Sequence, residues 1–283
     1  SCAQSSASVS GYVQFQYLND MGGAAKGIGV AFATVTVSGS EDLGGGLKAA
    51  YSSEIGLGEA RDQRLSKRDT SLALSDDFGA LTIANTQSSS LLVTQAMVGT
   101  NNNGWYGPYD YSESIVKRSP VDSLSFSKEV GPVNITAEYA ESQDDGNTSP
   151  ATKTASLGIA YSAGALTVAA RVKSGQNATW AGARNKRAFE VGGSYDFGVA
   201  KVGVALDTKR VGESTSEKEG VAFGIAVPVG SVVLGLGTIK RGDVQFTEAR
   251  VNYALSKRSD IEFNYGKVKD TSHYSQVVIS HAF

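Results

Sequence analysis

The sequence predicts an all-β fold, a transmembrane antiparallel β-barrel of about 16 strands. Apolar and polar residues alternate along short segments from one end of the chain to the other. Tight turns and longer polar loops separate these segments in regular succession. No apolar run approaches the ~20 residues that a transmembrane helix needs. We expect residues 1–283 to form one barrel domain.

The alternation follows the two-residue period of a β-strand. Leu166, Val168 and Val172 alternate with Thr167 and Arg171, for example, which puts the two sets on opposite faces of a strand. The composition agrees, because 33 Gly, 12 Tyr and 10 Phe with only 5 Pro suit strands joined by turns. Alternation alone also fits a soluble sandwich, so the turns decide between the two folds.

Short turns and longer loops alternate along the chain. We expect tight turns at 40–44, 75–79, 129–132, 162–164, 196–198, 228–230 and 255–258. Polar loops of variable length lie between them, at 20–26, 58–64, 87–113, 141–152, 174–185, 211–217, 241–243 and 270–272. This rhythm is typical of transmembrane barrels, whose short turns face the periplasm and whose longer loops face outside.

The segments between these turns and loops are the predicted strands. They are 7–19, 27–39, 46–57, 65–75, 79–87, 114–128, 132–141, 153–162, 165–174, 185–196, 199–210, 218–228, 231–240, 244–255, 258–269 and 273–283. An even number puts both chain ends on the periplasmic side. The last segment ends on the aromatic Phe283 and is expected to pair with the first, which removes both sheet edges. Aromatic residues near strand ends predict interfacial girdles: Tyr17, Tyr51, Tyr139, Tyr161, Tyr195, Phe197, Tyr253 and Tyr265.

Composition also argues against several classes of function. A formal net charge of −2 gives no reason to expect nucleic acid as a partner, and a single Cys excludes an intrachain disulfide. The only histidines are His273 and His281. The spacing of neither one to other residues supports a nucleophile–base–acid arrangement or a transition-metal site. We therefore expect no enzyme and no cofactor. Asp144, Asp145 and Asn147 leave loop calcium as an alternative to a solvated turn.

Five segments, in order along the chain, carry a family resemblance. They are GSEDLGGGLKA at 39–49, KRDTSLALSDDFG at 67–79, GSYDFGVAK at 193–201, YALSKR at 253–258 and HAF at 281–283. Together they resemble the general diffusion porins of Gram-negative bacteria, most closely the beta-proteobacterial trimeric type. The resemblance implies an outer-membrane channel for passive diffusion of ions and small polar solutes.

The same resemblance implies partners and a constriction. It implies a homotrimer surrounded by outer-membrane lipid and lipopolysaccharide. It makes Phe283 an assembly signal, read by the barrel-assembly machinery through the C-terminal strand. It also implies that the third extracellular loop, here about residues 87–113, folds into the lumen as a constriction.

The candidate pore-lining residues come from the loop and from strand parity, that is, from which alternate positions of each strand face the lumen. On the wall, the inward-facing basic candidates are Lys48, Arg171, Lys173, Lys186, Lys209 and Arg250, and the acidic ones are Glu54, Glu138, Glu190, Asp207, Glu248 and Glu262. At the constriction we add Asp110 and Glu113 on the loop, with Lys117 and Arg118 just after it. Acid on the loop facing base on the wall would set up a transverse field. Each residue is also explained as a solvated lumen side chain.

The sequence departs from the family at positions that bear on ion preference. Thr34 and Ser38 stand where relatives commonly carry an arginine and a lysine, and Asn85 lies where the fifth strand commonly ends in an arginine motif. These departures predict a pore that is less anion-selective than its basic relatives. They also leave open a substrate-specific channel of the same fold. A plugged barrel would need a separate N-terminal domain, whereas the first strand begins by about residue 7.

Overall fold

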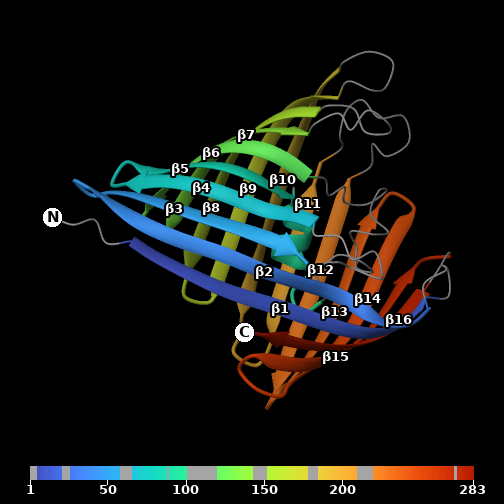
Figure 1. The fold of residues 1–283 in the computed structure, drawn as a ribbon. Helices are drawn as coiled ribbons and strands as arrows, with labels where there is room; N and C mark the ends of the chain where they lie inside the picture. Colours follow the sequence, from blue (N-terminus) through green and yellow to red (C-terminus); the bar gives the residue numbers. More distant parts are fainter. Residues whose placement is uncertain are drawn as a thin grey trace.

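The computed structural model describes residues 5–20, 26–57, 66–87, 89–100, 120–142, 152–177, 184–208, 219–270 and 273–283. These residues form a closed antiparallel barrel in which each strand pairs with its neighbours in the chain and β1 pairs with β16 (Figure 1). In the described residues, no helix is long and apolar enough to cross a membrane.

The barrel has 16 strands, as predicted. They are β1 (Ser5–Asp20), β2 (Lys26–Gly44), β3 (Leu47–Gly56), β4 (Ser66–Asp76), β5 (Gly79–Gln87), β6 (Pro120–Val130), β7 (Val133–Ser142), β8 (Thr152–Ala163), β9 (Leu166–Asn177), β10 (Arg184–Asp196), β11 (Lys201–Asp207), β12 (Gly220–Val229), β13 (Val232–Arg241), β14 (Val244–Ala254), β15 (Ser259–Val268) and β16 (His273–Ala282). The start of β1 and the end of β16 lie at the barrel end that carries the short turns.

One predicted turn is displaced. Residues 40–44 were expected to form the first tight turn, but β2 continues to Gly44 and the reversal falls at Gly45 and Gly46. The cause is an irregularity at the end of β2, where the register with β3 shifts between Asp42 and Gly44. The Asp42 carboxylate accepts a hydrogen bond of 2.9 Å from the Gly44 backbone N–H, and this local bond holds the extra residue.

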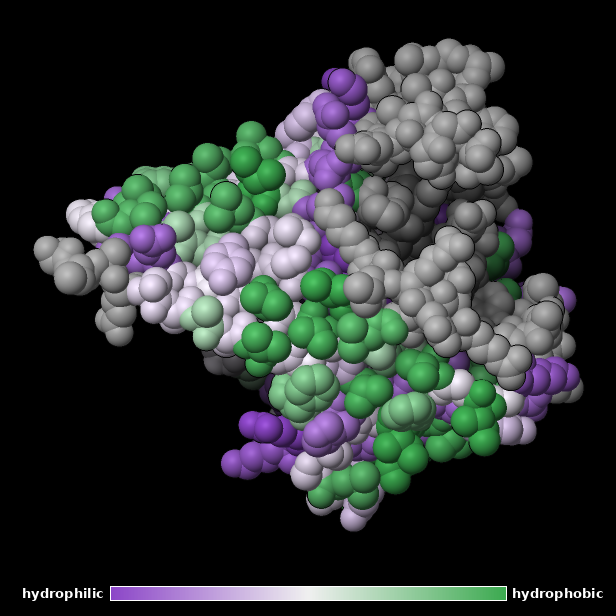
Figure 2. Space-filling view, viewed as in Figure 1, coloured by the Kyte–Doolittle hydropathy of each residue, from purple (hydrophilic) through white to green (hydrophobic). Residues whose placement is uncertain are grey.

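The outer and inner faces follow the predicted parity. Large apolar side chains such as Leu72, Ile83 and Phe263 point outward and are exposed in the isolated barrel, where lipid would cover them. Figure 2 shows such side chains over much of the visible surface. All the aromatic residues predicted for the girdles are exposed on the outer face: Tyr17, Tyr51, Tyr139, Tyr161, Tyr195, Phe197, Tyr253 and Tyr265.

The seam between β1 and β16 ends on the terminal aromatic residue. Gly11 and Phe283 exchange two backbone hydrogen bonds, of 2.9 and 3.0 Å. The ring of Phe283 lies over Gly11, so closely that a Cβ atom on residue 11 would lie 2.6 Å from Phe283 Cε1. Glycine at position 11 therefore leaves the space that the terminal ring fills, and the ring covers the last bonds of the seam.

The contact between the Phe283 ring and Gly11 predicts that Gly11→Leu destabilises the closed barrel. The added side chain would displace the Phe283 ring, and overpacking of this kind costs about 1–3 kcal/mol. We expect a lower yield of folded barrel and a lower unfolding midpoint in denaturant, measured by gel mobility and tyrosine fluorescence. Val9→Leu is the control, because Val9 is 68% exposed on the same strand face. Equal stability of the two variants would show that the contact between Phe283 and Gly11 does not stabilise the closed barrel.

Candidate functional site: the lumen and its third loop

The described start of the third loop, residues 89–100, lies inside the barrel. It contains a short π-helix, η1 (Leu92–Ala96), which contacts β9, β10, β11 and β12. Ser90 begins this turn, because its carbonyl oxygen accepts hydrogen bonds from the backbone N–H groups of Val93 and Thr94, at 3.1 and 3.0 Å. This described part of the predicted loop therefore lies in the lumen, as expected.

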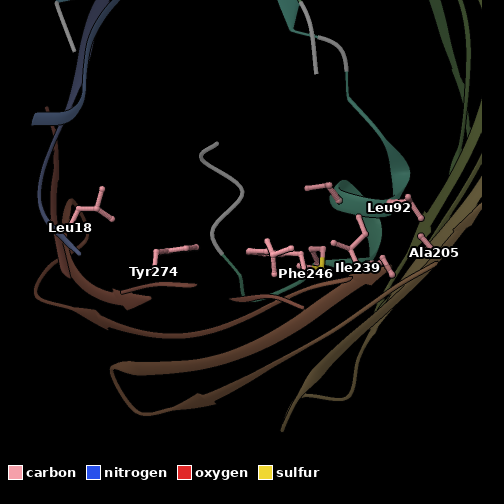
Figure 3. Close-up of a cluster of buried hydrophobic side chains, with 11 residues drawn as sticks. Leu18, Leu92, Ala205, Ile239, Phe246 and Tyr274 are labelled. Carbon is pink, nitrogen blue, oxygen red and sulfur yellow. The ribbon is translucent and has the colours of Figure 1, made fainter. Parts of the chain in front are cut away.

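The loop turns its apolar side to the wall. Leu92, Val93, Ala96 and Met97 are buried and belong to one cluster with Ala205, Ala222 and Ile239 of the wall. Figure 3 shows Leu92 beside Ala205, with Ile239 and Phe246 on the neighbouring strands. Burial of these side chains removes apolar surface from the aqueous lumen and binds residues 92–97 to the wall.

Three charged residues fix the beginning of the loop. Arg171 Nη2 donates to the Ser89 carbonyl oxygen at 2.8 Å, and Lys173 Nζ donates to the same oxygen at 3.3 Å. Glu190 holds both cations, with Arg171 Nη2 2.5 Å from Oε2 and Lys173 Nζ 3.3 Å from Oε1. Glu190 is 1% exposed and also accepts a 3.4 Å bond from the Leu91 N–H. A buried carboxylate needs such partners, because an unpaired one is costly.

A second charged cluster fixes the other end of the described loop. Arg250 Nη1 donates to the Thr100 carbonyl oxygen at 3.3 Å, and its Nη2 forms an ion pair with Glu262. Asn252 and Asn264 each donate to Glu262 at 3.3 Å. The loop is thus held at Ser89 and at Thr100 by arginines that are themselves held by buried acids.

Two further ion pairs line the lumen. Arg241 and Asp207 form a buried pair beside the start of η1. On the other side of the barrel, Arg68 Nε lies 3.0 Å from Glu54 Oε1, and the guanidinium lies 4.1 Å from the centre of the Phe32 ring. Attraction to the ring face orients the Arg68 side chain along the wall.

The structure separates the predicted site residues into groups. Arg171, Lys173 and Arg250 lie against the loop, and Glu54 lies against Arg68. Lys48 is the second residue of β3, beside the short turn, and its register partners are Asp42 and Ser75. Glu138 is on the lumen face of β7 opposite Ser125 and Ser156. The described residues do not include Asp110, Glu113, Lys117 and Arg118, nor the calcium alternative at 144–147.

Sequence parity missed two lumen cations and misplaced one polar residue. Arg68 lies within a register shift, between Lys67 and Thr70, and the extra residue there breaks simple alternation on β4. Arg241 was assigned to a loop, but it ends β13. Asn85 has the parity of the exposed Ile83 and donates to Asp122 Oδ1 at 2.6 Å on the outer face. Asn85 therefore says nothing about the charge of the lumen, whereas Thr34 is buried on the lumen face.

Comparison with known proteins decides the family. A family model described as Gram-negative porin matches residues 1–273. This chain belongs to the Gram-negative porin family. It is therefore an integral outer-membrane protein that forms a diffusion channel, and the family points to a passive channel rather than an enzyme.

Solved porin structures share this fold at low sequence identity. The anion-selective porin from Comamonas acidovorans is 22% identical, with a TM-score of 0.76 and coverage of 99% of this chain and 100% of that chain. A loop L8 deletion mutant of OmpT from Vibrio cholerae is 15% identical, with a TM-score of 0.77 and 99% of both chains covered. Salmonella typhi OmpF in complex with daunomycin is 12% identical, with a TM-score of 0.77, covering 98% of this chain and 97% of that chain. No curated protein sequence matches the chain.

The anchor at Ser89 predicts that Glu190→Gln changes channel behaviour more than the loss of another lumen acid. Without the Glu190 charge, Arg171 and Lys173 repel each other and hold the Ser89 carbonyl less firmly. We expect larger open-channel current noise and a shift of the reversal potential toward anions, both measured in planar bilayers.

The matched control for this prediction is Glu138→Gln. This variant also removes one negative charge from the lumen wall, and no described contact joins Glu138 to the loop. We expect quiet openings and a smaller shift in ion preference. If the two variants gave the same noise and the same reversal potential, Glu190 would not be an anchor of the loop.

Proposed function

We propose that this channel passes ions and small polar solutes with weak ion selectivity and is less anion-selective than basic members of its family. The supporting observation is that the lumen cations of the loop anchors and of the two further ion pairs lie beside acids. Glu54 partners Arg68, Glu190 partners both Arg171 and Lys173, Asp207 partners Arg241 and Glu262 partners Arg250. Five cations stand against four acids in these clusters, which leaves a net charge of only +1 and therefore a small net field in the pore.

Single-channel recording across a salt gradient tests this proposal. We expect stepwise openings of the wild-type protein and a reversal potential close to zero, because the lumen clusters nearly neutralise one another. A strong anion preference, as the name of the Comamonas acidovorans porin records for that protein, would contradict the proposed selectivity. Absence of openings at all salts and voltages would instead favour a substrate-specific channel, which solute-uptake assays in liposomes would identify.

We also propose that the channel has no catalytic activity. Ser259 Oγ lies 2.9 Å from His281 Nδ1 at the exposed end of the β15–β16 hairpin. The adjacent Asp260 accepts a hydrogen bond of 2.8 Å from Asn252 instead of orienting the histidine. Among the residues that the structure describes, no acid orients this Ser–His pair, so the pair gives no support to nucleophilic catalysis.

We further propose that the protein is a homotrimer, as one form of OmpT from Vibrio cholerae is described to be. The support comes from outward-facing polar residues that continue in register across four strands. Ser53 pairs with Thr70, Thr70 with Asn85, and Asn85 with Asp122. Ser53 and Thr70 share a hydrogen bond of 3.2 Å, and Asn85 donates to Asp122 at 2.6 Å.

The polar row runs over β3 to β6. On β11 to β15 many outward positions are apolar and exposed, as at Val204, Phe223, Leu236, Val251 and Phe263. Thr238, Gln245 and Thr247 form a second outward polar group on β13 and β14. Figure 2 shows a paler area of small and weakly polar residues over β2 and β3, between more apolar areas. Polar groups in the hydrocarbon region are costly unless protein covers them. Contact with a neighbouring subunit on this wall would remove that cost.

The proposed subunit contact predicts that replacing Asn85 and Asp122 together by leucine weakens the trimer. If a neighbouring subunit covers the row, the polar contacts across the interface are lost, and we expect dissociation to monomeric barrels at lower temperature on non-denaturing gels. Leu236→Ala on β13 is the control and should leave the trimer unchanged. A double variant that dissociates at the wild-type temperature or higher would show that the row faces lipid.

The remaining partners of the proposal follow from the family resemblance. We propose that Phe283 is the assembly signal presented by β16 to the barrel-assembly machinery, and that lipid and lipopolysaccharide surround the apolar walls. The exposed ring of Phe283, which is 55% exposed at the end of the seam, supports the first of these proposals.

A further inference from the structure

The third loop rests on the barrel wall at points where the wall has no side chains. Gly203 on β11, Gly224 on β12 and Gly235 on β13 face the loop backbone. A Cβ atom on Gly203 would lie 2.5 Å from the carbonyl oxygen of Gln95 and 2.7 Å from that of Ala96. A Cβ atom on Gly224 or Gly235 would meet loop carbonyl oxygens at still shorter distances. Backbone touches backbone at all three positions.

Strand geometry gives no other reason for these three glycines. They lie within strands and, unlike the turn glycines, do not have positive φ angles. Gly203 and Gly224 are direct register partners, and Gly224 is in turn paired with Gly237. Glycine within a strand weakens it, and close approach of another backbone is one of the reasons it is found there. Here that other backbone is present and consists of residues 95–99.

We infer that Gly203, Gly224 and Gly235 determine the size limit of the pore, because they let the third loop lie directly on the wall. The inference rests on the proposed function, in that it requires an open and conducting lumen. Each wall strand at these glycines is hydrogen-bonded to a neighbour on both sides, as its place in the closed barrel requires. Within the described parts of the chain, the loop segment is bound only on the side that faces the wall. A side chain inserted between them therefore moves the loop toward the pore axis.

The loop anchors strengthen this inference. Ser89 and Thr100 are fixed to the wall by Arg171 and Arg250, so the segment between them spans the strands that carry the glycines. A segment held at both ends can rise only in its middle, which is the part that lies over Gly203 and Gly224. Added volume there narrows the pore without releasing the loop.

The test is a graded series at one position, Gly224→Ala, Gly224→Val and Gly224→Leu, in the full-length protein. Single-channel conductance in planar bilayers and the rate of liposome swelling with sugars of increasing size are measured for each folded variant. We expect conductance to fall in the order of side-chain volume, and uptake of the largest permeant sugar to be lost first. Gly203→Ala, whose Cβ would meet Gln95 and Ala96 in the middle of the segment, should show the same direction of change.

The matched series at Gly29 separates the position of the added side chain from its volume. Gly29 lies on β2, pairs with the lumen-facing Gln16, and has no described atom within 4 Å of its Cβ position. Gly29→Ala, Gly29→Val and Gly29→Leu thus add the same groups to the lumen wall away from the loop. We expect a much smaller loss of conductance in this series.

The outcomes separate this inference from the proposed function. If the wild-type protein does not conduct, the proposed function fails. If it conducts and the Gly224 series equals the Gly29 series, or conducts more than wild type, the inference is overturned. Gel mobility of each variant confirms that the barrel is folded. Should the larger substitutions prevent folding, Gly224→Ala decides, since its Cβ alone already overlaps the Ala96 carbonyl oxygen.

Discussion

The pairing of every backbone polar group inside the hydrocarbon layer is the constraint on which this structure depends. A bilayer offers no water to an unpaired N–H or C=O group, so a sheet can cross it only as a closed ring. Closure requires a last strand that pairs with the first, and here Gly11 and Phe283 complete that pairing. Closure also gives each strand one lipid face and one aqueous face, which is why the sequence alternates. Irregular backbone is tolerated only where it lines the water-filled lumen, and there the third loop lies.

The charges of the lumen have two roles that the structure joins. Arg171 and Arg250 are pore-wall cations, and they also hold the carbonyl oxygens of Ser89 and Thr100. Each needs a buried acid close by, Glu190 or Glu262, to be held in place. The position of the loop and the net field of the pore therefore depend on the same side chains. An ionic wall that fixes a loop in this way is close to neutral, because a lone buried charge would be too costly.

Much of this fold could be predicted from the sequence because two-residue alternation directly reports the two faces of each strand. The 16 strands and their closure were predicted, with boundaries that mostly differ by a few residues. The errors fall where one residue is added to a strand. The register shift in β4 moved Arg68 to the lumen, and the bulge at Asp42 lengthened β2. Such shifts depend on local hydrogen bonds, which alternation does not encode. Asn85 was misplaced for a different reason. It was matched to a position of the family without establishing whether that position faces the lumen or the outside of the barrel.

The candidate site was less predictable, because parity gives the face of a residue and not its height in the barrel or its neighbours. Parity selected Glu138 and Glu190 equally, although only Glu190 is buried beneath the loop. The signal that could have distinguished them lies in the wall itself. Glycine and alanine alternate with larger outward residues on β11 to β13, and small inward residues on adjacent strands mark a wall that another backbone approaches. The polar row that a neighbouring subunit would cover lies outside β3 to β6, whereas η1 of the loop docks inside β9 to β12. The loop can therefore change the pore without changing the surface that a neighbouring subunit would cover.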